Sequence, residues 1–170
     1  MSRIVELRAR LARGEITHEV LVQQALDAAQ GPAAAHVFTR LHPQAALAAA
    51  RHADALVRAG VPVASGGPLA GLPVTVKDLF DVAGEATWAG SALRQEEPAA
   101  APAQADAPTV ARLRAAGAAI LGKTNMSEFA FSGVGINPHF GTPRNPHDAA
   151  LARIPGGSSS GAAVSVALGL

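Results

Sequence analysis

A run of glycines and serines near the C-terminal end of the chain has the residue types of a loop that could perform chemistry. Three serines, Ser158 to Ser160, stand between Gly156-Gly157 and Gly161. Far upstream, Lys77 lies in an apolar run rich in valine. A serine hydroxyl and a lysine that can lose its proton together provide a route to acyl transfer that needs no histidine. Lys77 and the serine loop therefore form the first candidate site.

The scarcity of lysine draws attention to each one that is present. Of the 14 lysines and arginines in the chain only two are lysines, Lys77 and Lys123. Lysine acts as a base only when neutral, and burial lowers its pKa by desolvating the ammonium. Asp78 would point to the opposite face of a regular strand and need not hold Lys77 charged. We expect apolar neighbours to supply the buried setting, namely Val74, Val76, Leu79 and Phe80.

Both features also have an ordinary structural interpretation. A lysine at a strand end can extend its stem along apolar surface and place its ammonium in water. A glycine- and serine-rich loop can be a flexible turn that caps the helix after it. The two features together, with their flanking residues, favour the catalytic interpretation.

Two other motif matches point to different chemistry. Residues 117–124 satisfy the phosphate-loop pattern GxxxxGK[ST], with Lys123 as its lysine. That loop requires a strand before its first glycine and a helix after its lysine, whereas the residues before Gly117 favour a helix. Residues 157–161 fit the nucleophile elbow GxSxG with Ser159 as nucleophile, but Pro155 makes the preceding segment a poor strand. We expect neither motif to function, and Lys123 to be structural.

Composition limits the classes of function. The 170 residues are 49% hydrophobic with a net charge of +1, which predicts a buried core and gives no electrostatic reason to expect nucleic acid or a membrane surface as partner. No cysteine is present, which excludes disulfides and fits a cytoplasmic protein. The N-terminus lacks the apolar core of a signal peptide. The six histidines have no spacing typical of a metal site, so we expect neither metal nor cofactor.

The pattern of apolar residues predicts an α/β fold of alternating helices and strands. Thr17 should cap a helix within residues 1–30, and either Asp106 or Thr109 should cap a later one. The residue ranges are as follows: helices over 1–30, 43–60, 108–116 and from 160 on, a helical turn over 126–132, strands over 73–82 and 118–121, and loops over 61–71, 95–107 and 133–157.

Several segments in order resemble the amidase signature family, from about residue 11 to Leu170. They include residues 67–73, the Lys77-Asp78 pair, residues 89–91, 122–130, 140–146 and 155–161. The resemblance implies the N-terminal part of the amidase signature fold, a mixed β-sheet core flanked by helices, here incomplete. Residues 1–60 would be a helical N-terminal segment, and residues 61–170 would begin the α/β catalytic core of one domain.

The resemblance also implies site residues. Lys77 matches the family's catalytic lysine, and Ser158 matches the bridging serine of a Ser–cis-Ser–Lys triad, so we expect a cis or strained peptide near residues 157–159. Met126 to Ser132 matches a segment that lines the acyl pocket, and Ser159 would contribute to substrate binding. The nucleophilic serine of the family follows in a later Gly-Gly-Ser loop and has no match among these residues. We therefore expect a truncated chain with exposed apolar edges, poor solubility and no amide hydrolysis by itself.

Four functions follow from these patterns. The first is a hydrolase that cleaves a small carboxylic amide to acid and ammonia, with a homo-oligomer left open. The second is the A subunit of an aspartyl/glutamyl-tRNA amidotransferase, a carbon–nitrogen ligase-like subunit that would need partner subunits and tRNA. The third is a phosphate-loop nucleotide-binding module that uses Lys123. The fourth is a non-catalytic fragment that only associates with other chains.

Overall fold

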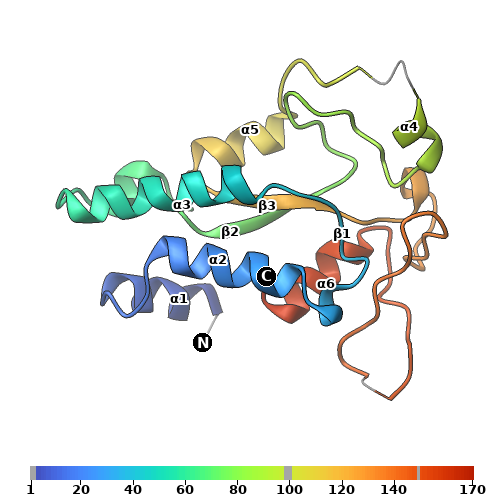
Figure 1. Ribbon diagram of the computed structural model, residues 1–170, viewed down its shortest axis with the longest axis horizontal. Coiled ribbons are helices and arrows are strands. Elements are labelled where there is room, and N and C mark those ends of the chain that lie inside the picture. The colour runs from blue at the N-terminus through green and yellow to red at the C-terminus, as the bar shows by residue number, and fades with distance from the viewer. Residues whose placement is uncertain (1–2, 98–100, 149) are drawn as a thin grey trace.

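A mixed three-stranded β-sheet lies at the centre of the fold (Figure 1). The computed structural model describes residues 3–97, 101–148 and 150–170. The sheet has the strand order β1-β3-β2, with β3 antiparallel to β1 and parallel to β2. The strands are β1 (Phe38–Leu41), β2 (Pro73–Lys77) and β3 (Ala119–Thr124). The central strand, β3, is buried along its whole length.

An irregularity in β3 decides which way its second half faces. Val74 pairs with Ile120, but Thr75 pairs with Gly122, so Leu121 is skipped on the β2 side. The extra residue reverses the alternation of side chains, which is what a β-bulge does. Gly122 permits the close approach of β1 there, because a Cβ at this position would lie 2.2 Å from the Arg40 carbonyl oxygen. As a result Lys123, paired with Val76, lies on the same face of the sheet as Val76.

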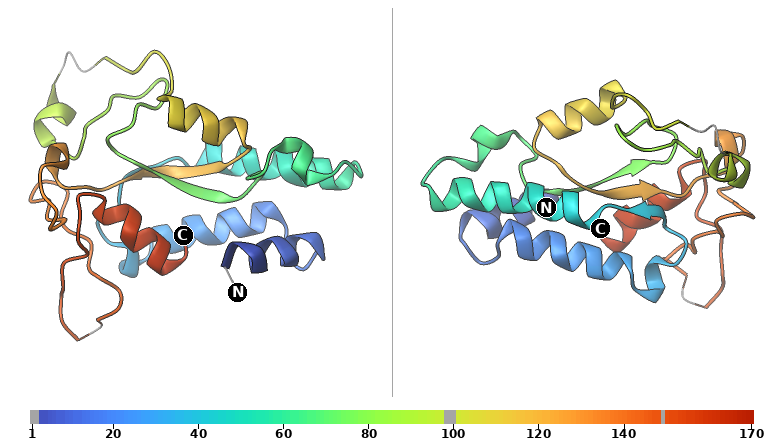
Figure 2. Two further views of the ribbon diagram at one scale, coloured as in Figure 1. Left: turned by 180° about the vertical axis from the view of Figure 1, so that it is seen from behind. Right: turned by 45° about the horizontal axis from the view of Figure 1, so that its top comes forward.

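Helices cover the two faces of the sheet unequally. One face carries α1 (Arg3–Ala12), α2 (His18–Ala29) and α6 (Ser160–Leu168), and the other carries α5 (Pro108–Ala115), as the views in Figure 1 and Figure 2 agree. On the first face α2 and α3 (Pro43–Arg58) pack against Ala119 and Leu121. On the α5 face the cluster consists of Val76, Val82, Val110 and Ile120.

The sequence pattern predicted most of the helices. Thr17 caps α2 as expected, with its hydroxyl accepting a hydrogen bond from the Val20 amide at 3.1 Å. The predicted caps of α5 are wrong: Ala107 occupies that position, and Asp106 instead binds the Ala83 amide and Arg114. A short helix, α4 (Ala92–Glu96), overlaps the start of the predicted loop over 95–107, of which residues 98–100 lie outside the described residues. Three 3₁₀ turns complete the helical structure, namely η1 (Pro32–Ala34), η2 (Val63–Gly66) and η3 (Glu128–Ala130).

The strands differ more from the sequence prediction. β2 ends at Lys77 rather than at residue 82, because the chain turns there and the Phe80 amide donates to the Lys77 carbonyl oxygen at 3.0 Å. β3 runs three residues past the predicted end at Leu121 and so includes Lys123 and Thr124. β1 was not predicted, since its four residues are all half-buried and show no apolar alternation.

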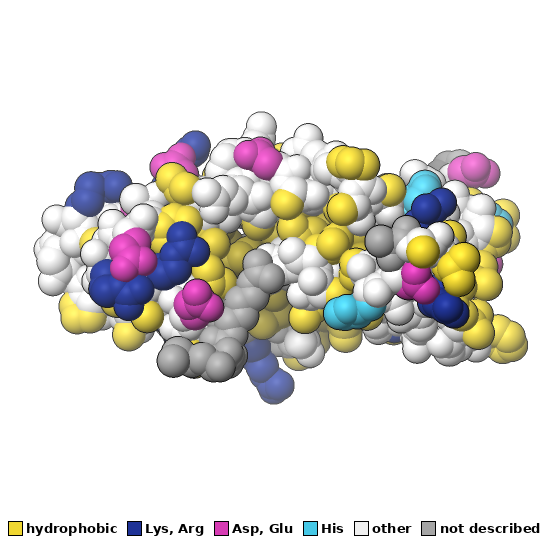
Figure 3. Space-filling view, turned by 90° about the horizontal axis from the view of Figure 1, so that it is seen from below, with side chains coloured by type: hydrophobic (Ala, Val, Ile, Leu, Met, Phe, Trp, Pro, Cys, Tyr) yellow, Lys and Arg dark blue, Asp and Glu magenta, His cyan; other side chains and the backbone are white. Residues whose placement is uncertain are grey.

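The outer edge of β2 is open and apolar. β2 has only β3 as a neighbour among the described residues, and beside it runs a groove of about 300 Å³ between α1 and α6. The groove is lined by Ile4, Leu7, Leu72, Pro73 and Val166, among others. Seen from below, where α1 and α6 lie, hydrophobic side chains gather along the middle of the face (Figure 3). The unpaired edge of β2 lies beside this apolar groove, but no residue of β2 itself is exposed, and the expected exposed apolar edge stays a prediction. No helix in the described part of the chain is long and apolar enough to cross a membrane.

Candidate functional site

The two lysines lie on opposite faces of the sheet. Lys77 is the last residue of β2, and its side chain points to the same face of the sheet as that of Thr75, two residues earlier. The Thr75 hydroxyl lies 3.3 Å from the hydroxyl of Ser165 on α6. Lys77 therefore faces the α6 side. Val76 and Lys123, paired across β2 and β3, face the α5 side. The bulge at Leu121 creates this separation.

Lys77 and Ser158 are in direct contact. The Lys77 Nζ atom donates a hydrogen bond to Ser158 Oγ at 2.8 Å, across 81 positions of sequence. Lys77 is half-buried, and this burial lowers the pKa of its ammonium below the ordinary value of 10.5. No ion pair involving Lys77 is found among the described residues, so no carboxylate there offsets the desolvation. The geometry provides an amine that loses its proton readily beside a hydroxyl that can exchange one with it.

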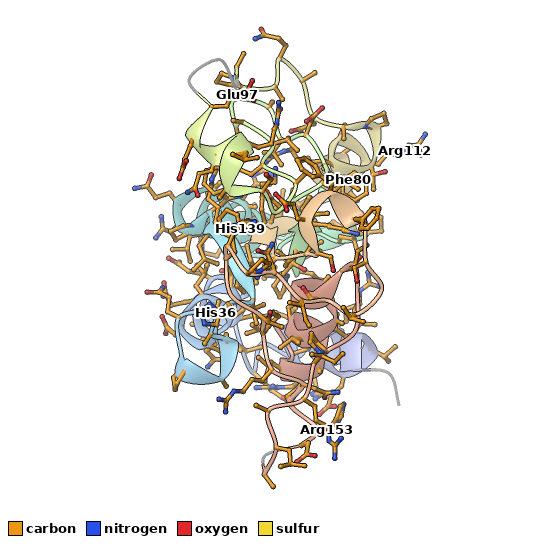
Figure 4. The ribbon with its side chains drawn as sticks, turned by 90° about the vertical axis from the view of Figure 1, so that its right-hand side faces the viewer. His36, Phe80, Glu97, Arg112, His139 and Arg153 are labelled. Atoms are coloured by element: carbon orange, nitrogen blue, oxygen red, sulfur yellow. The ribbon has the colours of Figure 1, made fainter. Side chains whose placement is uncertain are left out.

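The four apolar residues expected to surround Lys77 and lower its pKa do not surround it. Val74 and Val76 point to the face opposite Lys77, and Val76 packs into the cluster under α5. Leu79 and Phe80 lie past the end of the strand and are 42% and 37% exposed. Figure 4 views this loop end of the molecule, with Phe80, His139 and Arg153 spread across it. None of the four apolar residues therefore encloses Lys77 as predicted.

The serine loop is held by backbone hydrogen bonds to residues 125–133. The Ser127 amide donates to the Ser158 carbonyl oxygen at 3.0 Å, and the Gly157 amide donates to the Gly133 carbonyl oxygen at 2.8 Å. Glycine is required at position 157, because a Cβ there would lie 2.6 Å from the backbone of Gly135. The Gly157–Ser158 peptide bond is cis, which confirms the expected cis peptide.

The start of α6 lies directly after Ser158. Ser159 occupies the N-cap position without a side-chain capping bond, and the helix begins at Ser160, as predicted. The Gly161 amide donates to the Asn125 carbonyl oxygen at 2.9 Å, and a Cβ on Gly161 would lie 2.2 Å from the Val37 carbonyl oxygen. The small residues of this helix therefore allow it to approach the chain segments at the ends of β1 and β3 closely. No strand precedes Ser159, so the nucleophile-elbow pattern lacks its required context.

Lys123 does not form a phosphate loop. It is fully buried within β3, and its Nζ lies 3.3 Å from Asp78 Oδ1. A helix precedes Gly117 and a strand contains Lys123, which is the reverse of the order that phosphate binding needs. The hypothesis of a nucleotide-binding module is wrong for this reason. Burial raises the pKa of Asp78, and the nearby Gly90 amide and Lys123 act in the opposite direction.

The three weaker site candidates lie near the serine loop in different settings. Met126 is fully buried and packs toward Gly90, so it does not line an open pocket. Ser132 is half-buried, and its carbonyl oxygen accepts the hydroxyl of Ser127 at 2.9 Å. Ser159 is half-buried, one residue past Ser158. Their role in substrate binding stays a prediction.

Two residues that hold the site together were missed by the sequence analysis. Asn137 is 1% exposed and donates from its amide to the carbonyl oxygens of Gly90 and Met126, both at 2.8 Å. Asn125 donates from its amide to the carbonyl oxygens of His36 and Gly141. The only sequence signal is an asparagine within a glycine-rich loop, a side chain suited to binding backbone groups. No group of three or more histidine, aspartate or glutamate residues in the described ranges could hold a metal ion.

Known proteins with similar sequences share one family. The sequence profile of the family described as Amidase matches residues 20–170. The A subunit of the glutamyl-tRNA(Gln) amidotransferase of Bordetella avium is 42% identical over 96% of this chain and 30% of its own length. The 2-amino-5-chloromuconic acid deaminase of Comamonas testosteroni is 41% identical over 98% of this chain and 35% of its own length.

Solved structures give the same picture. The peptide amidase of Stenotrophomonas maltophilia superposes with a TM-score of 0.75 at 38% identity, over 95% of this chain and 33% of that one. A structure described as a vestigial protein complex that reveals the origins of an s-triazine catabolic enzyme superposes with a TM-score of 0.86 at 39% identity, over 97% of this chain and 35% of that one. The chain thus spans about a third of the length of these relatives.

Proposed function

Because the chain belongs to the amidase family, we propose that Lys77 and Ser158 are the proton-relay half of a site that hydrolyses a small carboxylic amide to an acid and ammonia. The observation that carries the proposal is the 2.8 Å contact between Lys77 Nζ and Ser158 Oγ. The lowered pKa of Lys77 supports it, since a base must be neutral to accept a proton.

In the proposed reaction the relay carries a proton in both directions. Neutral Lys77 takes the proton of Ser158, whose oxygen takes the proton of the attacking serine hydroxyl. When the amide bond breaks, the same path returns a proton to the leaving nitrogen, which departs as ammonia. Water then repeats the attack on the acyl-serine and releases the acid. The attacking serine is expected from the later Gly-Gly-Ser loop of the family, and Lys77 and Ser158 do not replace it.

A chimera tests this role. Residues 1–170 would replace the matching third of the Stenotrophomonas maltophilia peptide amidase, which is 38% identical to this chain. Ammonia release from a simple peptide amide should then fall by about 10²- to 10⁴-fold in Lys77→Met and in Ser158→Ala, the range of general acid–base catalysis. Ser65→Ala, at an exposed serine outside the serine loop, is the control and should retain most activity. Equal activity in Lys77→Met and the parent chimera would overturn the proposal.

The 170 residues alone should not hydrolyse amides, since the relay has no attacking serine. Purified chain incubated with the same amide should release no ammonia above the background of its Lys77→Met variant. Turnover that disappears with Lys77 would contradict this expectation and would require a nucleophile within these residues.

A second function is favoured by specific relatives. The A subunit of the glutamyl-tRNA(Gln) amidotransferase of Bordetella avium matches almost the whole chain. We propose as the alternative that the site releases ammonia from an amide for a partner protein that acts on tRNA. The same chimera strategy, built into that relative, separates the two: activity only in the presence of partner subunits and tRNA favours the alternative, and activity without them favours the hydrolase.

A further inference from the structure

The buried pair of Lys123 and Asp78 is an energetically costly feature of the fold. The side chains are 0% and 1% exposed, with Lys123 Nζ and Asp78 Oδ1 3.3 Å apart. Neither of these two atoms makes a well-directed hydrogen bond to any described residue. A buried ion pair with such incomplete hydrogen bonding is commonly no more stable than apolar residues of the same size. Stability alone therefore gives little reason for its presence.

Asp78 binds the turn at Ala89 and Gly90 with both its backbone and its side chain. The Gly90 amide donates to Asp78 Oδ2 at 3.0 Å, and the Ala89 amide donates to the Asp78 carbonyl oxygen at 3.2 Å. Both turn residues have positive φ, at 54° and 68°. The orientation of the Asp78 carboxylate, with Lys123 at its other oxygen, therefore determines where this turn lies.

The turn at Ala89 and Gly90 also makes hydrogen bonds, independent of Asp78, to the segment that follows β3. Asn137 donates from one amide nitrogen to the carbonyl oxygens of Gly90 and Met126, both at 2.8 Å. A Cβ on Gly90 would lie 2.9 Å from the Met126 carbonyl oxygen, so the two backbone segments are too closely packed to admit a side chain at this position. The Phe129 amide also donates to the Ala89 carbonyl oxygen at 2.9 Å.

These contacts close a ring around the proposed relay. The residue after Met126 is Ser127, whose amide donates to the Ser158 carbonyl oxygen at 3.0 Å. Ser158 contacts Lys77, and Lys77 is covalently joined to Asp78. The path therefore runs from Asp78 through the 89–90 turn, Asn137 and residues 126–127 to Ser158, and returns through Lys77.

We propose that Lys123 and Asp78 are positioning residues, which fix the 2.8 Å contact between Lys77 and Ser158 through this ring. Lys123 orients the Asp78 carboxylate, the carboxylate holds the turn, and the turn and Asn137 hold the segment that carries Ser158. The inference rests on the proposed function, since it assigns a role to residues that serve the same relay from the opposite face of the sheet.

The pKa of Lys77, measured in the 170-residue chain, reports on the contact between Lys77 and Ser158, and this measurement does not require catalytic activity. A trace of acetic anhydride added at a series of pH values acetylates the neutral amine, and mass spectrometry of the Lys77 peptide gives its pKa. Ser158→Ala removes an acceptor of the ammonium and should lower this pKa by about half a unit, about a threefold change in the ratio of neutral to charged amine. The fully buried Lys123 should remain unlabelled in chains that retain it, which shows that the fold is intact.

The decisive comparison repeats Ser158→Ala in a chain that also carries Asp78→Leu and Lys123→Met. This pair of changes leaves no buried charge without a partner, so the chain should fold by circular dichroism. If the two residues position the relay, Ser158→Ala should no longer shift the pKa of Lys77 in this background. The matched control carries Asp106→Leu and Arg114→Met, because Asp106 also pairs a cation at 2.8 Å and binds a backbone amide. The shift should persist in the control.

Each outcome is decisive. A full shift in the Asp78→Leu/Lys123→Met background would overturn the positioning role and leave the relay intact. Failure of that background to fold would also overturn it, since the pair would then be a requirement of folding. No shift even in the unaltered chain would overturn the relay itself and with it the proposed function.

Discussion

The two lysines of this chain occupy neighbouring strands and opposite chemical settings. Lys123 points to the α5 face, is fully buried and faces a carboxylate 3.3 Å away. Lys77 points to the α6 face, is half-buried and faces a hydroxyl 2.8 Å away. Burial lowers the pKa of Lys77, and its Nζ forms no ion pair within the described ranges. The group that each ammonium faces, a hydroxyl for Lys77 and a carboxylate for Lys123, therefore decides which lysine is suited to act as a base.

The two faces of the sheet also carry different kinds of polar group. The α5 face holds the charged pair, and the α6 face holds the hydroxyl loop. A single skipped residue in β3, Leu121, brings Lys123 to the face of Val76 and Asp78 rather than to that of Lys77. Without the bulge, the two ammonium groups would lie on one face and repel one another.

The largest effect should come from removing the charge at Lys123. Lys123→Met leaves the Asp78 carboxylate buried without its cation, and should lower the free energy of unfolding by about 3–5 kcal/mol. Urea denaturation followed by circular dichroism measures this. Arg114→Met, which breaks a more exposed pair at 2.8 Å, should cost about 1 kcal/mol or less. Equal losses for the two variants would show that burial of the Lys123 pair has no special cost.

The serine loop on the other face should be the next most sensitive region. Gly135 has a φ of +82°, and a Cβ there would lie 2.1 Å from the Gly156 carbonyl oxygen. Gly135→Ala should therefore cost about 1–3 kcal/mol in unfolding free energy and weaken the response of Lys77 to Ser158→Ala. Gly133→Ala provides the control, since a Cβ there meets nothing within 4 Å. If both alanine variants unfold at the same urea concentration as the parent, the loop can shift to accept a side chain at Gly135, and the expected destabilisation is wrong.

Acid should weaken the α5 face through His42. Burial lowers the pKa of His42 below 6.5, although Glu85, 2.9 Å from its Nε2, raises it, and Arg40 lowers it further. As pH falls through 6.5 the unfolded chain takes up a proton that the folded chain resists, so stability should fall by up to about 1.4 kcal/mol per pH unit. Urea titrations between pH 7.5 and 5 should show a smaller slope for His42→Gln than for His147→Gln, a change at an exposed histidine. A steeper slope for His42→Gln would reverse the assigned sign.

The smallest effect should come from removing the charge at Lys77. The ammonium is half-buried without a carboxylate partner, so Lys77→Met should match or exceed the parent in stability, by about 1 kcal/mol at most near neutral pH. Because the pKa of Lys77 is lowered in the fold, this advantage should shrink as pH rises toward 10.5. Parallel urea curves at pH 7 and pH 10 test both statements. A loss as large as that of Lys123→Met would remove the contrast between the two lysines.

The sequence drew attention to Lys77 and Ser158, which are in contact in the structure, but it did not predict their surroundings. Lys77 and Ser158 stand out by residue type, since one is a rare lysine and the other opens a run of serines between glycines. The pairing of Lys123 with Asp78 depends on the bulge at Leu121, and no periodic pattern predicts an inserted residue. The role of Asn137 depends on where three separate loop segments meet, and that arrangement exists only in the folded chain.

The long separation between Lys77 and Ser158 affects how the site forms during synthesis. Their contact spans 81 positions, and β2 must first pair with β3 across a connection that carries α4 and α5. Closing such a loop costs entropy before any contact offsets it, and contacts of this kind form slowly. Lys77 therefore leaves the ribosome well before Ser158. Until α6 emerges, Ala34 and Val37 lack Val164 as a packing partner, and the nascent chain is more open to misassociation in that interval.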